Sequence, residues 1–342
     1  MEPNTGNETL DVVGVGNAIV DVLAQADEAF LDAQDLAKGA MTLIDGARAE
    51  ALYAAMGPGV EMSGGSAANT MAGLASLGGR GAFVGKVRND QLGGIFGHDI
   101  RASGVTFETP AATEGPPTAR CLIFVTPDAE RTMGTYLGAS VDLMAEDLDA
   151  AVIGRAKVTY LEGYLWDAPE AKAAFLEAAR MAHGAGRKVA LTLSDPFCVE
   201  RHRDSFIELI GGHVDLLFAN DVEICALFQV DDFDRALQEV RGHCEVAALT
   251  RSAKGSVVLR DGEVHLVDAE PVAKVVDTTG AGDLYAAGFL YGFTQGRSLY
   301  DCGCLGAIAA AEAISHFGAR PEAPLAALAA ERLDGGPAGV RH

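Results

Sequence analysis

The stretch Asp277-Thr278-Thr279-Gly280-Ala281-Gly282-Asp283 decides the fold prediction, because it joins a glycine-rich turn to a helical segment. The residues that follow, LYAAGF at 284–289, are small or apolar and predict a helix. Gly280, Ala281 and Gly282 let successive backbone amides point into one concavity at the helix N-terminus, where the helix dipole adds partial positive charge. This turn therefore predicts a phosphate site that needs no lysine.

Asp283 is the candidate general base of this site. On the first turn of the helix its carboxylate lies beside the concavity, where it can accept a proton from a hydroxyl that attacks a phosphoryl group. The alternative is an ordinary glycine-rich turn whose aspartate is favoured by the helix dipole. The Asp-Thr-Thr lead before the glycines favours the phosphate site.

Around this turn, short β-branched runs alternate with longer Ala-rich helical segments, which predicts a parallel sheet with helices on both faces. Strands are expected at 11–16, 81–85, 156–161, 188–193, 214–219 and 246–250, and helices at 67–77, 91–103, 169–184, 221 onward, 281–294 and 299–317. A hairpin is expected at Asp261-Gly262, and a loose tail over 321–342.

Residues 105–137 depart from this rhythm. They alternate apolar and polar side chains and turn at Pro127-Asp128, which predicts a half-exposed antiparallel ribbon. The simplest architecture is one α/β domain over residues 1–342, with a central, mainly parallel sheet and a small β-sheet lid from about 20–43 and 105–137.

Composition restricts the partners. The net charge of −22 argues against nucleic acid and anionic membrane surfaces, which both repel a polyanion. The polar N-terminus predicts no secretory signal, and the sequence has no run of about 18 apolar residues that would predict a membrane span. The six cysteines form no C-x-x-C pair and are expected to be reduced thiols in a cytoplasmic protein.

Two further motifs predict a site for a hydroxylated ligand. In Ser63-Gly64-Gly65-Ser66-Ala67-Ala68-Asn69, the glycine pair permits close approach and Asn69 can bind a sugar hydroxyl; a flexible helix entry with Asn69 as a local cap is the alternative. Gly14-Val15-Gly16 begins like a dinucleotide fingerprint, but Ile19 stands at its third glycine and no helical pattern follows. Asp21 can instead hold a vicinal diol.

Two weaker signals concern the metal and the phosphate. Asn220 can cap a helix with Glu223 at the capping-box position, or the pair can organise Mg²⁺ through water. Arg131, in the ribbon, can reach the phosphate when a lid closes, although an isolated arginine is by default a solvated surface residue. The sequence has no G-x-x-x-x-G-K-[ST] motif, which excludes a P-loop enzyme.

These motifs together resemble the ribokinase-like, or PfkB-type, carbohydrate kinases. Residues 64–69, with glycines running on to Gly93, look like the first signature of that family, and 277–289 look like the second. Segments 16–21, 191–197 and 214–223 are most similar to the adenosine kinase branch. The resemblance covers roughly residues 10–322 and implies a ribokinase-like three-layer αβα fold.

The resemblance also implies roles, residue by residue. Asp283 matches the catalytic base, Gly280, Ala281 and Gly282 the anion hole, and Arg131 the lid arginine. Asn17, Asp21, Gly64, Gly65 and Asn69 match substrate-binding positions; Asn220, Thr250, Ser252, Gly255 and Gly282 match ATP-side positions; Asn220 and Glu223 match the Mg²⁺-organising pair. The chain departs from the branch at Asp195, at Ser252, where glycine is usual, and at Thr279.

The implied activity is ATP- and Mg²⁺-dependent phosphorylation of the 5′-hydroxyl of adenosine to AMP, a step of purine salvage, with K⁺ as a further expected ion. A base clamp is expected from Ile19, Cys121, Met133 and Tyr164 or Leu165. The alternatives are a kinase for a free sugar such as ribose, fructose or 2-keto-3-deoxygluconate, an NAD-dependent oxidoreductase, and a non-catalytic ligand-binding relative. Either a monomer or a homodimer is compatible with an exposed lid ribbon.

Overall fold

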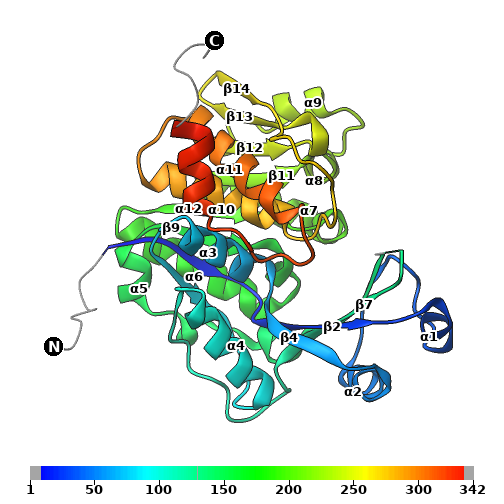
Figure 1. Cartoon of the computed structure of the whole chain (residues 1–342). Coiled ribbons are helices and arrows are strands. Elements are labelled where there is room, and N and C mark those ends of the chain that lie inside the picture. Colours follow the sequence, from blue (N-terminus) through cyan, green and yellow to red (C-terminus); the bar gives the residue numbers. More distant parts are fainter. Residues whose placement is uncertain (1–8, 129, 335–342) are drawn as a thin grey trace.

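The computed structural model describes residues 9–128 and 130–334, which form a large and a small β-sheet (Figure 1). The large sheet has the order β14-β13-β12-β11-β10-β9-β1-β5-β6, parallel except at β13 and β14. Its strands are β1 (Leu10–Val15), β5 (Gly81–Val84), β6 (Thr106–Phe107), β9 (Ala156–Glu162), β10 (Lys188–Thr192), β11 (Leu216–Asn220), β12 (Val246–Thr250), β13 (Ser256–Arg260) and β14 (Glu263–Val267).

Helices cover both faces of this sheet. One layer contains α5 (Ala150–Arg155), α6 (Pro169–Gly184), α7 (Pro196–His213), α8 (Asp221–Phe228) and α9 (Phe233–Glu239); the other contains α3 (Ser66–Ser76), α4 (Gln91–Ala102), α10 (Ala281–Thr294), α11 (Leu299–Ala313) and α12 (Leu325–Ala329). Successive residues of β1 point to opposite layers, because Val13 packs in the core with Phe175 of α6 and Val12 in the core with Phe289 of α10. The predicted three-layer αβα fold is confirmed.

The small sheet projects from the large unit, as Figure 1 shows. Its strands, in the order β3-β8-β7-β2-β4, are β2 (Ile19–Gln25), β3 (Met41–Leu43), β4 (Gly59–Gly64), β7 (Ala119–Val125) and β8 (Arg131–Tyr136). Helices α1 (Glu28–Ala33) and α2 (Gly46–Ala55) cover one face, where Leu31 and Leu52 pack in one cluster with Val22 and Phe124. The opposite face lies toward the large unit.

The small sheet differs from the expected lid at two places. Segments 20–43 and 105–137 supply β2, β3, β7 and β8, but β4 comes from outside both and pairs antiparallel with β2. Its sequence, GVEMSG, lacks the β-branched alternation that predicts a strand. Within 105–137, β6 instead joins the large sheet, because the buried ring of Phe107 packs against Phe83 and Phe96.

The C-terminal region also differs from the prediction. Residues 321–334 are not loose: α12 packs beneath α11, with Leu325 fully buried against Leu284 and Leu305. An alanine-rich sequence gave no periodic signal for this short helix. The remainder of the predicted tail, 335–342, lies outside the described residues. Elsewhere most predicted elements match the structure to within two residues at each end, and α11 ends at Ala313 rather than at 317.

Candidate active site

The predicted site residues gather where the order of the large sheet reverses. β1 lies between β9 and β5, so the chain runs in one direction from β1 to β6 and in the other from β9 to β12. Crevices outside the carboxyl ends of strands at such a point bind ligands in open α/β sheets. The link that follows β1, the end of β9 and the N-termini of α3 and α10 all meet here.

Asp283 is held by the first turn of α3. Ser66 Oγ donates to Asp283 Oδ1 at 2.6 Å, and Asn69 Nδ2 donates to Asp283 Oδ2 at 3.0 Å. The two glycine motifs, more than 200 residues apart, therefore form one site. Ser66 belongs to the first motif, although sequence reasoning did not assign it a role. Both hydrogen bonds orient the carboxylate and leave lone pairs for a hydroxyl proton.

Burial raises the pKa of Asp283, while its hydrogen bonds to Ser66 and Asn69 and the nearby Arg320 guanidinium lower it. The net shift is upward. A carboxylate with a raised pKa is a stronger base than one in water. The position suits proton abstraction from an alcohol.

The turn before α10 has the backbone of an anion site. Gly280 takes φ +79°, and a Cβ there would lie 2.5 Å from that of Ala319. No side chain caps α10, and a Cβ on Gly282 would meet no atom within 4 Å. The amide of Ala281 donates to Thr278 O at 3.2 Å, which closes the turn. Open space beside uncapped first-turn amides is suited to phosphate oxygens.

Asp21 lies on β2 beside the glycine pair. A Cβ on Gly64 would lie 2.4 Å from the Asp21 carboxyl carbon, and a Cβ on Gly65, at φ +94°, would lie 2.3 Å from Asn17 O. Position 65 therefore requires glycine, whereas a Cβ at position 64 would displace the Asp21 carboxylate. Burial raises the pKa of Asp21 to about 6; the guanidinium groups of Arg320 and Arg131 oppose the rise, and the Asp283 carboxylate adds to it.

A cavity of about 260 Å³ of empty space joins these groups. It is lined by Asp21, Leu23, Met62, Ser63, Asn69, Ile123, Arg131, Thr279, Gly318, Ala319 and Arg320. One carboxylate, from Asp21, one amide, from Asn69, two arginines and Thr279 beside the anion turn thus face one space. The small sheet supplies its apolar wall through Leu23 and Ile123.

Arg131 connects the small sheet to the anion turn. Its Nη1 lies 2.8 Å from Asp277 Oδ2, and both side chains are less than a tenth exposed. Asp277 also accepts hydrogen bonds from the amides of Thr279 and Gly318. Among the described residues, Nε and Nη2 of Arg131 have no hydrogen-bond partner. The arginine is therefore at the predicted site, with donors left for an anion.

Arg320 is a second arginine of the cavity, and sequence reasoning missed it. Its Nη2 donates to Ser63 O at 3.1 Å and to Ser63 Oγ at 2.8 Å, whereas Nε and Nη1 are buried and unpaired in the described part of the chain. Burial lowers its pKa to about 10. A lone arginine in an alanine-rich segment carries no local signal; only tertiary proximity reveals it.

Asn220 and Glu223 form a complete capping box at the start of α8. Asn220 N and Nδ2 donate to Glu223 at 2.9 and 2.7 Å, and Glu223 N donates to Asn220 Oδ1 at 2.8 Å. Burial raises the pKa of Glu223 to about 7, and the carboxylates of Asp195 and Asp283 add to the rise. In residues 9–128 and 130–334, no three acidic, His or Cys side chains converge to hold a metal directly. The acidic surroundings of Glu223 suit a divalent cation, because Mg²⁺ prefers oxygen ligands.

The predicted ATP-side turn follows β12. Thr250 ends the strand, Ser252 begins the 3₁₀ helix η4 (Ser252–Lys254) at φ +53°, and Gly255 has φ +76°. A Cβ on Gly255 would lie 2.0 Å from Val267 O. The positive φ of Ser252 explains why glycine is usual at this position.

The expected base clamp is partly assembled. Ile19, Cys121 and Met133 lie in one apolar cluster on the small sheet, together with Ile123. Leu165 is not available, because it is buried in the core of the large unit. Tyr164 is partly exposed. The carboxylates of Asp195 and Asp283 join burial in raising the pKa of the Tyr164 hydroxyl, so Tyr164 lies near the candidate general base, Asp283.

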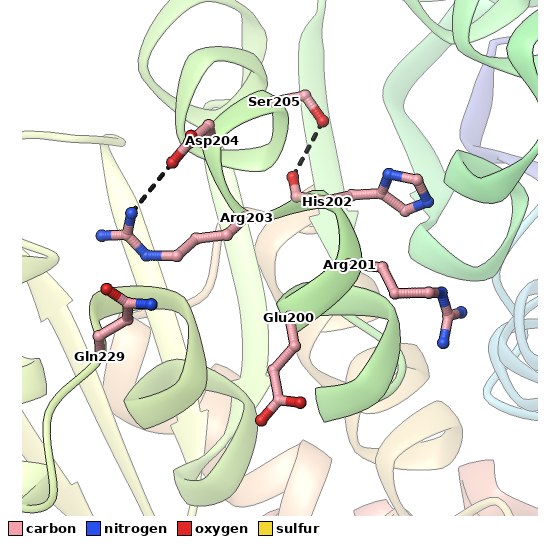
Figure 2. Close-up of a pocket in the computed structure, with 7 residues that line it drawn as sticks. All are labelled: Glu200, Arg201, His202, Arg203, Asp204, Ser205 and Gln229. Atoms are coloured by element: carbon pink, nitrogen blue, oxygen red, sulfur yellow. Dashed lines mark hydrogen bonds and ion pairs between the residues drawn. The ribbon is translucent and has the colours of Figure 1, made fainter.

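A larger groove, of about 790 Å³, lies on α7 near its distorted residue His202, and Figure 2 shows the side chains that line it. Its lining, Glu200 to Ser205 with Gln229, includes none of the predicted site residues. Arg203 pairs with Asp204 at 3.0 Å, and Ser205 Oγ donates to His202 O at 2.9 Å. The cavity beside Asp283, although smaller, is therefore the candidate active site.

The fold and the arrangement of the cavity agree with a family of kinases that phosphorylate an alcohol, to which the family model assigns the chain. Residues 53–326 match the family model of the pfkB family carbohydrate kinases. The chain belongs to this family. The dinucleotide interpretation is wrong, because β2, rather than a helix, follows Gly16.

Solved structures and curated proteins resemble the chain over most of its length. Adenosine kinase from Sinorhizobium meliloti is 56% identical with a TM-score of 0.88, covering 94% of this chain and 99% of that one. A probable sugar kinase protein from Rhizobium etli is 53% identical with a TM-score of 0.89, covering 96% and 99%. Adenosine kinase 1 from Arabidopsis thaliana is 28% identical over 340 residues, covering 92% and 96%.

Across the described residues, no helix has the length and apolar character needed to cross a membrane. All six cysteines are free thiols.

Proposed function

We propose that the protein is an ATP-dependent adenosine kinase, which transfers the γ-phosphoryl group of ATP to the 5′-hydroxyl of adenosine and forms AMP and ADP. The observation that carries the proposal is the placement of Asp283. Its carboxylate is oriented by Ser66 and by Asn69, and Asn69 lines one cavity together with Asp21. The similarity to the S. meliloti and A. thaliana adenosine kinases supports the nucleoside substrate.

The ribose is bound between β2 and the first motif. The Asp21 carboxylate accepts hydrogen bonds from the vicinal 2′- and 3′-hydroxyls, and Asn69 adds a further polar contact. The glycines at 64 and 65 let the first motif pack closely against β2 and the β1–β2 link, since a Cβ at either position would meet Asp21 or Asn17. Asn17 supports this surface rather than touching the ligand, because its amide group is bonded to Glu162 and Ser140.

Phosphoryl transfer uses Asp283 and the anion turn. The 5′-oxygen attacks the γ-phosphorus while Asp283 takes its proton, and the bond to the β,γ-bridging oxygen of ATP breaks to release ADP. The uncapped amides at the start of α10 stabilise the charge on the transferring group, and Arg131 adds its unpaired N–H groups when the small sheet acts as a lid. Closure excludes water and limits ATP hydrolysis.

The ATP side lies along β11 and β12. Thr250, Ser252 and Gly255 form the turn that contacts the nucleotide, and Asn220 with Glu223 organises Mg²⁺ through water. Bound Mg²⁺ supplies positive charge to the phosphate oxygens. The family resemblance also predicts K⁺ near the anion turn; a comparison of kcat in potassium and choline salts tests this.

A free-sugar kinase is the alternative, and the R. etli neighbour is named a probable sugar kinase. The apolar cluster of Ile19, Cys121, Ile123 and Met133 favours the nucleoside, because it gives the cavity an apolar wall through Ile123, which suits a purine ring better than a free sugar. ADP release should be measured with adenosine, ribose, fructose and 2-keto-3-deoxygluconate. A kcat/KM for any sugar that equals or exceeds that for adenosine would overturn the proposal.

A further inference from the structure

The chain passes between the two sheets four times, and three of these passages are short links that meet near the end of β9; the fourth, 108–118 between β6 and β7, is longer. Residues 16–18 join β1 to β2, and Gly65 joins β4 to α3. Leu137 joins β8 to the 3₁₀ helix η1 (Gly138–Asp142), after which Leu143 packs in the core of the large unit. Any rotation of the small sheet relative to the large one must bend these links.

Glu162, the last residue of β9, reaches two of the links directly. Glu162 is only 1% exposed. Oε1 accepts hydrogen bonds from Asn17 Nδ2 at 2.7 Å and from Asn17 N at 3.3 Å, and Oε2 accepts one from Ala67 N at 2.8 Å. One buried carboxylate thus binds the β1–β2 link and the start of α3 together.

The third link is bound through Asn17. Its Oδ1 accepts a hydrogen bond from Ser140 Oγ in η1 at 2.8 Å. The packing around the carboxylate is tight, since a Cβ on Gly16 would lie 2.4 Å from Glu162 Oε2 and 2.6 Å from the Cβ of Ala67. Elements before β2, after β4 and after β8 therefore share one hydrogen-bonded centre.

This centre also adjoins the catalytic base. Ala67 lies between Ser66 and Asn69, the two residues whose side chains hold the Asp283 carboxylate. Its amide is one of the helix N-terminal donors that no intrahelical acceptor serves. The bond to Glu162 therefore sets the position of the turn that orients Asp283.

We propose that Glu162 is a positioning residue: its carboxylate is the pivot on which the small sheet turns, and it keeps the first turn of α3 aligned with Asp283 during closure. The catalytic part of this inference rests on the proposed kinase function. The pivot itself is a property of the unliganded protein and is measurable without substrate.

Glu162→Gln tests the pivot with almost no change in volume. All three groups that face the carboxylate are N–H donors, and the glutamine amide offers one acceptor oxygen and one NH₂ group. At least one N–H is then opposed by another donor. Glu162→Asp keeps the charge but shortens the side chain by one methylene, so it retains part of the network.

Asp11→Asn is the matched control. Asp11, on the opposite end of β1, is also a buried carboxylate with three donors: the Arg80 amide, Lys157 and Gln295. It lies far from the links. Comparison of the two variants therefore separates the pivot from the general cost of disturbing a buried carboxylate.

Two measurements follow. Hydrogen–deuterium exchange of the unliganded protein should show faster exchange at 16–18, 65–67 and 137–140 together in Glu162→Gln, and not in Asp11→Asn. In steady-state assays, kcat for adenosine should fall about 10–100-fold in Glu162→Gln and less in Glu162→Asp, with KM for ATP within about threefold of the parent, because misplaced groups slow the chemical step. Asp11→Asn should stay within about twofold of the parent kcat.

The inference is overturned if exchange rises at one link only, or if kcat of Glu162→Gln falls no further than that of Asp11→Asn. If Glu162→Gln does not fold, exchange in the parent decides: adenosine should slow exchange at all three links together, and slowing at one link alone overturns the pivot. A parent that turns over no adenosine contradicts the proposed function, whereas the exchange result in the unliganded variants still tests the pivot.

Discussion

Asp283, the proposed general base, carries a cost for the unliganded protein. Burial raises the pKa of its carboxylate, so the ionised form is destabilised in the folded state near neutral pH. Two side-chain donors and the Arg320 guanidinium offset part of this penalty. The unliganded site therefore retains part of the cost of burying this carboxyl group, which is the usual compromise between stability and activity.

We expect Asp283→Asn to lower kcat for adenosine by about 100-fold or more, because the general base is removed. Steady-state ADP release measures this. The variant should remain folded, with a Tm at pH 8 no lower than the parent value, since a buried charge has been deleted. A kcat within about tenfold of the parent, in a folded protein that still binds ATP, would contradict the assigned role.

Asp21 makes a separate, pH-dependent prediction. Its pKa of about 6 means that the carboxylate is ionised above pH 6 and becomes protonated as the pH falls through that value. Ribose hydroxyls then lose their charged acceptor, so the Kd for adenosine should rise on the acid side. Calorimetric titrations across this range should show the rise in the parent.

Asp21→Asn supplies the control for that titration. It should weaken adenosine binding about 10–100-fold at pH 8, the usual value of a hydrogen bond to a charged group, and it should flatten the dependence near pH 6. An unchanged pH dependence in Asp21→Asn would assign the titration to another group.

Among the elements, the turn between β12 and β13 departs from ideal backbone geometry. Ser252 is a non-glycine residue at φ +53°, a conformation that costs an L-residue roughly 1–2 kcal/mol. The 3₁₀ helix η4 that it begins is nevertheless formed, because Arg251 N donates to Gly255 O at 2.7 Å and closes the loop.

We expect Ser252→Gly to raise the free energy of unfolding by up to about 1 kcal/mol, after allowance for the greater freedom of glycine in the unfolded chain. Thermal and denaturant unfolding measure the change. The KM for ATP should stay within about twofold if the backbone of the turn makes the contact. A loss of stability would show that the serine hydroxyl makes a bond that outweighs the strain.

The small sheet is held to the large unit by buried polar contacts. Its outer face is covered by α1 and α2, so its other face is free to form the wall of the cavity. Arg131 reaches Asp277 from β8, and Glu162 binds the links at the opposite end of the sheet. The buried Arg131–Asp277 ion pair thus connects the small sheet to the anion turn, and the buried Glu162 carboxylate connects its links to the start of α3.

At the scale of the whole molecule, the acidic groups make stability depend on pH in two directions. Burial raises the pKa of Asp21 to about 6 and those of Glu162 and Glu223 to about 7. Between their unfolded values, near 4, and these folded values, the native state holds protons that the unfolded state releases, so stability falls as pH rises. Asp11, Asp167 and Asp215 have lowered pKa values, so their contribution is lost as pH falls below about 4.

We therefore expect the Tm of the unliganded protein to be highest near pH 5 and to decline toward pH 8. Repulsion within a chain of net charge −22 acts in the same direction. Added NaCl should recover part of the loss at pH 8 by screening. A scanning calorimetry series at fixed ionic strength checks this, and a Tm that rises steadily from pH 5 to pH 8 would contradict it.

The same acidity is compatible with ATP as a substrate. The anion turn relies on backbone amides and the dipole of α10, and two arginines supply local positive charge without a basic surface. The net charge therefore disfavours polyanionic partners such as nucleic acid. Phosphate binding depends instead on the local arrangement of a few groups.

The sequence by itself determined the αβα rhythm, the anion turn and the identity of Asp283, Asp21 and Asn69. These depend on local properties: hydrophobic periodicity, the φ freedom of glycine and the charge preference of a helix N-terminus. Such properties are visible in a few consecutive residues. That is why α6 and α10 have their predicted bounds.

Only the tertiary structure decided the remainder. β4 joins the small sheet by pairing rather than by its own propensity, and Arg320 reaches the cavity from a segment without a motif. Glu162 is buried against the links because β9 ends beside β1, an adjacency that topology creates between residues 145 positions apart. Contacts of this kind depend on which elements pack together, and no local pattern encodes them.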